Sequence, residues 1–200
     1  MKRIARLLVL ALWPLAAVAG DAPMNVIGRA DAPVMIVEFS DLECPHCAKY
    51  ERETFPEIRR LYVDTGQVLY VAMDLPLPMH KHAMPAAIAA RCAGMQDRFW
   101  AFRAAVFADQ ARLGQPSFLG DVAKKLGLDL KSFDACRKDP STQAAVLESF
   151  ETARNYQLTS TPSFMIGRLV GEEFVAEPLE GALPLAEFRR VIDAALESGD

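Results

Sequence analysis

The sequence predicts an α/β fold in which a βαβ half and a ββα half are separated by a helical insertion. Three observations lead to this prediction. First, two apolar runs rich in β-branched residues, at 34–39 and 67–73, lie on either side of a helical pattern. Second, the chain from 83 to 156 has helical spacing almost throughout. Third, strand patterns return after residue 162 and are followed by one amphipathic helix.

The first nineteen residues have the composition of an export signal. A start with three basic side chains is followed by an apolar stretch at 7–19, and Ala17-Val18-Ala19 supplies the small-x-small pattern that signal peptidase recognises. A membrane span is the alternative, but this stretch has thirteen residues and contains Pro14, whereas a span needs about twenty. We therefore expect cleavage between Ala19 and Gly20, and a mature protein that is free in the periplasm or secreted.

Charge and cysteine content limit what the mature chain can bind. Cleavage removes three basic residues and no acidic ones, so the formal net charge changes from −4 to −7. Binding to nucleic acid draws on clustered Lys and Arg, and we therefore expect no nucleic-acid partner. All four cysteines, Cys44, Cys47, Cys92 and Cys136, lie in the mature part, in a compartment where disulfides persist. Two bridges are therefore possible.

The first half begins with a short lead-in at 20–33, which offers an edge strand at 25–27. The run Val-Met-Ile-Val-Glu-Phe at 34–39 is nearly all apolar, which is typical of a central strand buried on both faces. Residues 67–73 have the same character, and a helix between the two strands makes their pairing parallel.

The helix of the first half is predicted over residues 44–63. Pro45 stands in its first turn, where a missing N–H is tolerated. Pro56 predicts a kink inside the helix, and Gly66 predicts its end.

The insertion is predicted to hold several helices, and the second half two strands and a helix. The residues predicted to separate or begin the insertion helices are Gly94, Gly114 to Pro116, Gly127 and Pro140 as breaks and Ser117 and Ser141 as caps. Strands are predicted at 163–170 and 172–176, with a turn at Gly171 between them. The last helix is predicted at 184–196, where apolar residues recur on one face.

Two cysteines separated by two residues, Cys44 and Cys47, follow the first strand and open the helix. The spacing lets their sulfur atoms close a small ring, and the unpaired N–H groups of a helix start point at the first sulfur. Cys44 is therefore predicted to be the nucleophile, as a thiolate that these donors and a protonated His46 stabilise. Cys47, one turn later, is predicted to be the resolving partner.

A structural site is the alternative for this cysteine pair. Zinc needs four ligands, and the chain has no second C-x-x-C and no pair of histidines at the spacing that zinc sites use. An inert structural disulfide stays open, because exported chains do use local bridges.

Two segments of the chain resemble a known family. Val37-Glu38-Phe39-Ser40-Asp41-Leu42-Glu43-Cys44-Pro45-His46-Cys47 resembles the active-site strand and helix start of DsbA-like proteins of the thioredoxin superfamily, and Ser160-Thr161-Pro162-Ser163-Phe164 resembles their cis-proline loop. The helical insertion is also similar, so the resemblance covers nearly all of the mature chain. It implies a thioredoxin fold with a helical insertion, thiol-disulfide exchange on exported proteins, Cys44 as the attacking sulfur and Pro162 in cis facing it. No cofactor beyond the Cys44–Cys47 disulfide is expected, and no metal.

Glu38, Thr161 and Pro162 are the further candidate site residues. A carboxylate buried at Glu38 could accept or deliver the proton of Cys47, a role that the resemblance supports, whereas the alternative places Glu38 at a strand end facing solvent. A cis peptide before Pro162 would let Thr161 present its backbone N–H and C=O to an extended substrate strand. Without the resemblance, a proline at this place is an ordinary strand start.

Cys92 and Cys136 lie in two different predicted helices, and a structural disulfide between them is the preferred reading. Such a bridge would close 45 residues, for which the chain-entropy model suggests about 4 kcal/mol as an upper figure. Two free buried thiols are the alternative. A second redox centre is disfavoured because the pair lacks C-x-x-C spacing and a helix start.

The stretch Met79-His80-Lys81-His82-Ala83-Met84 offers thioether and imidazole groups, which suit copper. The preferred reading is a connection into the next helix, because Pro78 and Pro85 bracket the stretch and Met often fills gaps in cores and at binding surfaces.

The direction of exchange is the open part of the functional prediction. His46 favours an oxidising disulfide, whereas Asp41 and Glu43 place negative charge near Cys44. Thr161 has a hydroxyl where some oxidases of the family have an apolar residue, and this matches some isomerases of the family better; we expect it to keep the disulfide short of the oxidising extreme. Against an isomerase, those relatives carry an amino-terminal dimerisation domain, for which the lead-in at 20–33 is too short.

We expect a monomeric oxidase that donates its disulfide to exported proteins bound as extended peptides and that a membrane redox partner recycles. A reductase or a specialised exchange partner is the runner-up, and a copper-binding or chaperone module is the non-enzyme alternative. The expected segments are 1–19 as signal peptide, 20–78 as the first half with the cysteine motif, 79–157 as the insertion and 158–200 as the second half.

Overall fold

The computed structural model describes residues 25–198, and the predicted signal peptide at 1–19 with its cleavage site lies outside the described residues. The predicted order of a βαβ half, a helical insertion and a ββα half is confirmed. Among the described residues, no helix is both long and apolar enough to cross a membrane.

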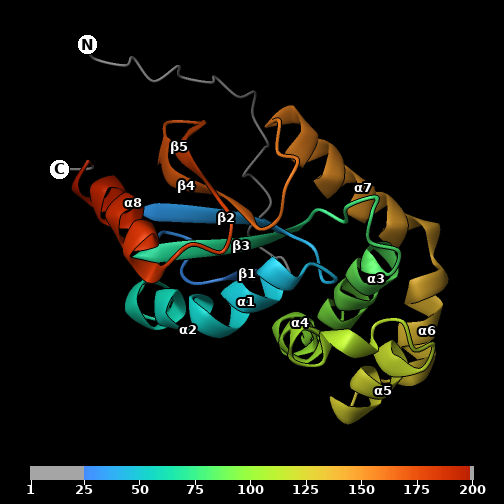
Figure 1. The fold of residues 1–200 in the computed structure, drawn as a ribbon. Helices are drawn as coiled ribbons and strands as arrows, with labels where there is room; N and C mark the ends of the chain where they lie inside the picture. The colour runs from blue at the N-terminus through green and yellow to red at the C-terminus, as the bar shows by residue number, and fades with distance from the viewer. Residues whose placement is uncertain (1–24, 199–200) are drawn as a thin grey trace.

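A five-stranded mixed sheet forms the centre of the molecule (Figure 1). Its strands, in the order in which they lie side by side, are β1 (Val26–Ile27), β3 (Val68–Asp74), β2 (Val34–Ser40), β4 (Ser163–Val170) and β5 (Glu173–Glu180). The pairing of β2 with β3 is parallel, and the other pairings are antiparallel. Because β2 runs antiparallel to β4, the start of β4 lies beside the end of β2, and Ser163 is opposite Phe39. This register brings the loop before β4 to the cysteine motif.

Helices cover both faces of the sheet. On one face lie α1 (Pro45–Glu53), α2 (Phe55–Ile58) and α8 (Leu185–Glu197), and α7 (Pro140–Asn155) lies on the other (Figure 1). The first face is held by a cluster of aromatic rings, in which Tyr50, Phe164 and Phe188 have centroids 4.7 to 5.3 Å apart. Such pairs stabilise by burying a large apolar area in a preferred geometry.

The remaining insertion helices form a second layer beside the end of β2. They are α3 (Ala83–Gly94), α4 (Phe99–Ala108), α5 (Phe118–Lys125) and α6 (Leu130–Lys138), with a short 3₁₀ turn at Gln110–Arg112. Their apolar core is continuous with the buried side chains of Leu42, Cys44 and Cys47. The insertion therefore forms one wall of the region that holds the cysteine motif.

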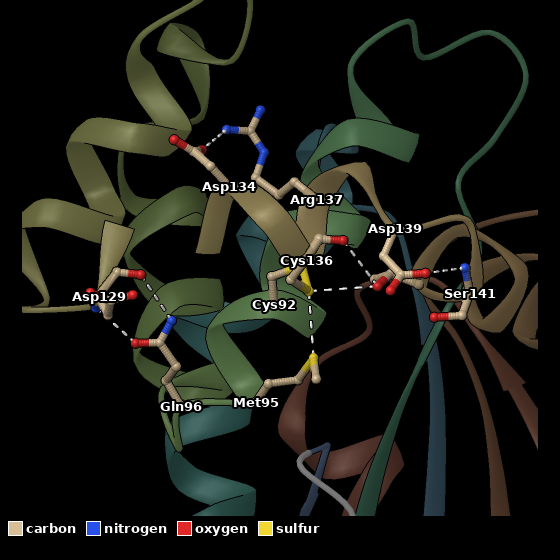
Figure 2. The surroundings of a disulfide bond; sticks show 10 residues. Cys92, Met95, Gln96, Asp129, Asp134, Cys136, Arg137, Asp139 and Ser141 are labelled. Carbon is tan, nitrogen blue, oxygen red and sulfur yellow. Dashed lines mark hydrogen bonds and ion pairs between the residues drawn. A yellow bond between two sulfur atoms is a disulfide. The ribbon is translucent and has the colours of Figure 1, made fainter. Parts of the chain in front are cut away.

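Cys92 of α3 and Cys136 of α6 form a disulfide, the pairing expected from the sequence (Figure 2). Their Cα atoms are 5.7 Å apart, within the ordinary range for a bridge. Cys92 is buried, and Cys136 is half-buried beside the exposed side chain of Met95. The bridge ties two helices of the insertion together at a distance from the sheet.

The helix predicted over 44–63 is divided, and not at Pro56. The helix α1 ends at Glu53, Thr54 separates it from α2, and residues 59–63 form a π-helical turn. Pro56 lies in the first turn of α2, where its missing N–H has no partner to lose.

Three other expectations are corrected. The cap of α7 is Asp139 and not Ser141, because the Asp139 carboxylate accepts a hydrogen bond of 2.8 Å from the Ser141 backbone N–H. Ser117 does precede α5, but its side chain makes no cap hydrogen bond and donates to Asp121 instead. The strand β5 continues past Ala176 to Glu180, because it is an edge strand and an edge tolerates Pro178.

Candidate active site

Cys44 occupies the N-cap position of α1. Its backbone is extended, with φ −75° and ψ 123°, and its side chain makes no cap hydrogen bond. Pro45 begins the helix, and the backbone N–H of Cys44 donates to the carbonyl oxygen of Asp41 at 3.1 Å. The sulfur of Cys44 therefore lies where the first N–H groups of the helix have no intrahelical partner.

Cys47 is fully buried one turn into the same helix. Its sulfur accepts a hydrogen bond of 3.5 Å from the backbone N–H of Asp41. Cys44 and Cys47 are both free thiols, so the structure shows the reduced form of the pair. Cys44 is also buried in this form, with 4% of its surface exposed.

The two thiols have opposite acidities. The hydrogen bond from the Cys47 thiol to the Cys44 sulfur is the main cause that lowers the pKa of Cys44 to about 5. The backbone N–H groups of Cys47 and His46 act in the same direction, and burial opposes them. Burial raises the pKa of Cys47 well above its ordinary value, and the charge of Cys44 adds to that effect. At neutral pH the first sulfur is therefore a thiolate and the second a thiol.

His46 contributes to this site in a different way from that expected. Its backbone N–H helps to lower the pKa of Cys44, whereas its side chain is exposed. The contribution of a protonated imidazole at His46 stays a prediction.

The peptide bond between Thr161 and Pro162 is cis, and it faces Cys44. In its protonated form the Cys44 thiol donates to the carbonyl oxygen of Thr161, and the sulfur and oxygen atoms are 3.4 Å apart. The hydroxyl of Thr161 is buried and has no hydrogen-bond partner in the described part of the chain. Its effect on the direction of exchange stays a prediction.

Glu38 lies in the middle of the central strand with no exposed surface, so the solvent-facing alternative is wrong. Both of its carboxylate oxygens accept hydrogen bonds from Nη2 of Arg103, at 2.6 and 2.7 Å, and one also accepts from the Tyr70 hydroxyl at 2.7 Å. Arg103 extends from α4 and bonds Ser40 and Glu51 as well. A buried charge needs such partners, and the insertion supplies the cation.

The carboxylates of Asp41 and Glu43 are engaged by the loop at 75–82. Asp41, also fully buried, accepts hydrogen bonds from the backbone N–H groups of Glu43 and Leu77 and lies 2.7 Å from Nδ1 of His80. Glu43 accepts from the backbone N–H of His82. The carboxylates of Asp41 and Glu43, whose negative charge was expected to oppose the Cys44 thiolate, are therefore bound by hydrogen-bond donors of the loop at 75–82.

The same loop contains the stretch considered for copper. The imidazole of His80 is already bound to Asp41, and the side chain of Met79 is 78% exposed. No group of three or more His, Cys, Asp or Glu residues suited to a metal ion is found in residues 25–198.

Gln110 holds the loop before α1 from the insertion side. Its side-chain amide donates to the carbonyl oxygens of Leu42 and Cys44, at 2.8 and 3.0 Å. Sequence reasoning did not identify Gln110, Arg103 or the pairing of His80. A basic residue on the apolar helix α4 is the one signal that could have pointed to a buried partner for Glu38.

Comparisons with known proteins agree with this geometry. A family model described as Thioredoxin matches residues 21–194. The crystal structure of α-DsbA1 from Wolbachia pipientis is 27% identical, covers 87% of this chain and 91% of that chain, and has a TM-score of 0.78. The crystal structure of DsbA2 from Pseudomonas aeruginosa is 29% identical, covers 87% of this chain and 94% of that chain, and has a TM-score of 0.71. The predicted fold class is therefore confirmed.

A sequence relative of another kind also matches. The Na(+)/H(+) antiporter NhaA 1 from Salinispora arenicola is 34% identical over 164 residues, which are 81% of this chain and 24% of the antiporter. The chain thus spans about a quarter of the length of that relative.

We predict that the reduced protein titrates one thiolate with a midpoint near pH 5, because the donors around Cys44 lower its pKa to about 5. The measurement is the thiolate absorbance near 240 nm against pH, together with the rate of alkylation by iodoacetamide. Cys44→Ser should remove the transition, and Cys47→Ala should leave a thiolate with a higher midpoint, because the main hydrogen-bond donor to the Cys44 sulfur is then absent. A transition that survives in Cys44→Ser would reverse the roles of the two cysteines.

We predict that Arg103→Met lowers the free energy of unfolding by about 3–5 kcal/mol, because it leaves the Glu38 carboxylate buried without its cation. Urea unfolding of the oxidised protein gives the value. The matched variant Glu38→Gln with Arg103→Met should lose clearly less, since no charge is then left unpaired. An equal loss in the double variant would show that the pair does not account for the effect.

Proposed function

The chain belongs to the thioredoxin family, and from that premise we propose that it is a thiol-disulfide oxidoreductase of the DsbA type that acts as an oxidase. The observation that carries this proposal is the asymmetry of the cysteine pair, in which the pKa of Cys44 is lowered to about 5 and that of Cys47 is raised. An environment that stabilises the Cys44 thiolate favours the reduced form of the pair. The disulfide form is therefore more oxidising.

The exchange proceeds in two displacements. A substrate thiolate attacks the Cys44 sulfur of the Cys44–Cys47 disulfide, the S–S bond breaks, and Cys47 leaves and takes up a proton. A second substrate thiolate then attacks the substrate sulfur of the mixed disulfide, and Cys44 leaves as a thiolate. The substrate dithiol is oxidised and the protein disulfide is reduced. The low pKa of Cys44 speeds the second step, because a more acidic thiol is a better leaving group.

Thr161 and Pro162 are proposed to present the substrate. The carbonyl oxygen of Thr161, which lies 3.4 Å from the Cys44 sulfur, is a main-chain group and can pair with an extended peptide laid beside it. Main-chain pairing accepts many sequences, which suits an enzyme that acts on many unfolded chains.

Glu38 is proposed to act on Cys47. Its negative charge is among the causes that raise the pKa of Cys47, and so it keeps the resolving thiol protonated. Its oxygens are occupied by Arg103 and Tyr70, which favours an electrostatic effect; the transfer of the Cys47 proton to Glu38 stays a prediction.

The wider setting is proposed from the sequence. The segment 1–19 is proposed to be a signal peptide, and the mature protein to act as a monomer in the periplasm or outside the cell. Exported proteins are its proposed substrates, and a membrane redox partner is proposed to restore the disulfide after each turnover. Residues 79–157 are proposed as the insertion between the two halves, 20–78 and 158–200.

A reductase is the second candidate. The carboxylates of Asp41 and Glu43 lie beside the motif, and their charge would make the disulfide less oxidising if the donors of the loop at 75–82 did not engage them. The redox potential decides between the two directions.

We predict that the oxidised protein transfers its disulfide to a reduced peptide with two cysteines, and that its redox potential lies between about −120 and −200 mV. The measurements are the peptide oxidation rate and an equilibrium titration against glutathione. Cys44→Ser should abolish transfer. In the reverse direction, reduced Cys47→Ser should accumulate a mixed disulfide with the oxidised peptide, because Cys44 can attack the peptide disulfide and no Cys47 thiol is present to release the peptide. A potential near about −270 mV, that of thioredoxin, would replace the oxidase by the reductase.

A further inference from the structure

Asp41 is a buried carboxylate that the exchange steps above do not use. It lies in the loop between β2 and α1, three residues before Cys44, and its side chain has no exposed surface. Its backbone bonds both cysteines, because its carbonyl oxygen accepts from the N–H of Cys44 and its N–H donates to the sulfur of Cys47. A side chain that binds the Asp41 carboxylate therefore lies near Cys44 and Cys47.

His80 is the ionisable group bound to that carboxylate. An ionised carboxylate can only accept, so Nδ1 of His80 must carry the hydrogen in the 2.7 Å contact with Asp41. The other ring nitrogen, Nε2, has no hydrogen-bond partner among residues 25–198, and about a fifth of the side chain is exposed. A second proton on the ring would therefore go to Nε2 and give an imidazolium that stays bound to Asp41.

The negative charges that act on His80 come from the segment around the cysteine motif. They are Asp41 and Glu43 of the loop before α1 and Cys44 at the N-cap of that helix. In its own loop, the charged residue next to His80 is Lys81. Asp74, at the end of β3, lies close enough to influence Asp41 and is itself paired with Arg91. Burial lowers the pKa of His80, but the hydrogen bond with Asp41 and the charges of Asp41, Cys44 and Glu43 outweigh it and raise the pKa above its ordinary value.

We propose that His80, held by the buried Asp41 carboxylate, is a positioning residue whose imidazolium stabilises the Cys44 thiolate and which takes up a proton when the Cys44–Cys47 disulfide is reduced. This inference rests on the proposed exchange function and adds a residue to it. The effect must be mutual, because a charge at Cys44 that favours the imidazolium is favoured by it to the same extent. The Cys44 charge exists only in the reduced form, so reduction binds a proton to His80.

The proposal balances the protons of the reaction. A substrate dithiol that becomes a disulfide releases two electrons and two protons. The protein disulfide takes up the two electrons and becomes the Cys44 thiolate and the Cys47 thiol, which accounts for one proton. The other proton goes to Nε2 of His80 where the ring is neutral, and to solvent where it is already charged.

The test is His80→Asn, because the side-chain N–H of Asn can still donate to Asp41 but cannot become charged. The titration of the Cys44 thiolate should move to higher pH, and the equilibrium constant with glutathione should become about tenfold less oxidising, which corresponds to about 30 mV. The dependence of the redox potential on pH should also change. Around neutral pH, wild type should take up more than one proton per disulfide reduced, and His80→Asn should take up one.

His82→Asn is the matched control, since His82 belongs to the same loop but contacts Glu43 through its backbone and not its ring. It should leave the thiolate titration, the equilibrium constant and the proton count at the wild-type values. A proton count that is unchanged in His80→Asn, or one that changes equally in His82→Asn, would overturn the proposal. If the wild type did not oxidise peptides at all, the proposed function would fail, and the absorbance titration of Cys44 in the same three proteins would still decide the role of His80.

Discussion

The structure depends on one local constraint, which is that Cys44 occupies the N-cap position of α1 while Cys47 lies one turn inside the helix. The first position places a sulfur among free N–H donors, and the second places a sulfur in the core. Two identical side chains three residues apart therefore receive opposite acidities. The strand β2 makes this possible, because it delivers the helix start to the edge of the sheet where the loop before β4 also ends.

Two buried carboxylates near the cysteine motif, those of Glu38 and Asp41, are each bound by several hydrogen-bond donors. Glu38 is neutralised by Arg103 from the insertion, and Asp41 is bound by two backbone N–H groups and His80 from the loop before α3. Gln110 fixes the backbone of the same loop from the insertion side. The insertion is therefore part of the site. It supplies Arg103, which pairs with Glu38 of the central strand, and Gln110, which hydrogen-bonds the backbone of the cysteine loop.

The sequence was informative where the pattern is local. The apolar runs predicted β2 and β3 within one residue at each end, the strand β4 was predicted at its observed bounds, and the spacing of Cys44 and Cys47 predicted the site. The sequence pattern could not predict hydrogen-bonded pairs whose residues lie far apart in the chain. Glu38 and Arg103 are separated by 65 residues, and Asp41 and His80 by 39.

Local composition was also misleading in places. The two histidines of the loop at 80–82 look like ligands, whereas the ring of one is bound to a carboxylate that only the fold brings near. The break after α1 could not be placed either, because a proline marks the start of a helical turn as readily as a kink.

The most direct test of this account is the difference in the free energy of unfolding between the reduced and the oxidised protein, measured in urea from pH 5 to 9. In the reduced form the pKa of Cys44 is about 5, below its unfolded value of about 8.5, so its contribution is fully present above the unfolded value and is lost as the pH falls through about 5. Cys44 does not titrate in the oxidised form. Cys47, whose folded pKa is raised, has the opposite effect, which appears as the pH rises through about 8.5. We therefore expect the reduced protein to lose stability relative to the oxidised protein as the pH falls from about 8 to about 5. A difference that does not depend on pH in this range would contradict the claim that the fold stabilises the Cys44 thiolate.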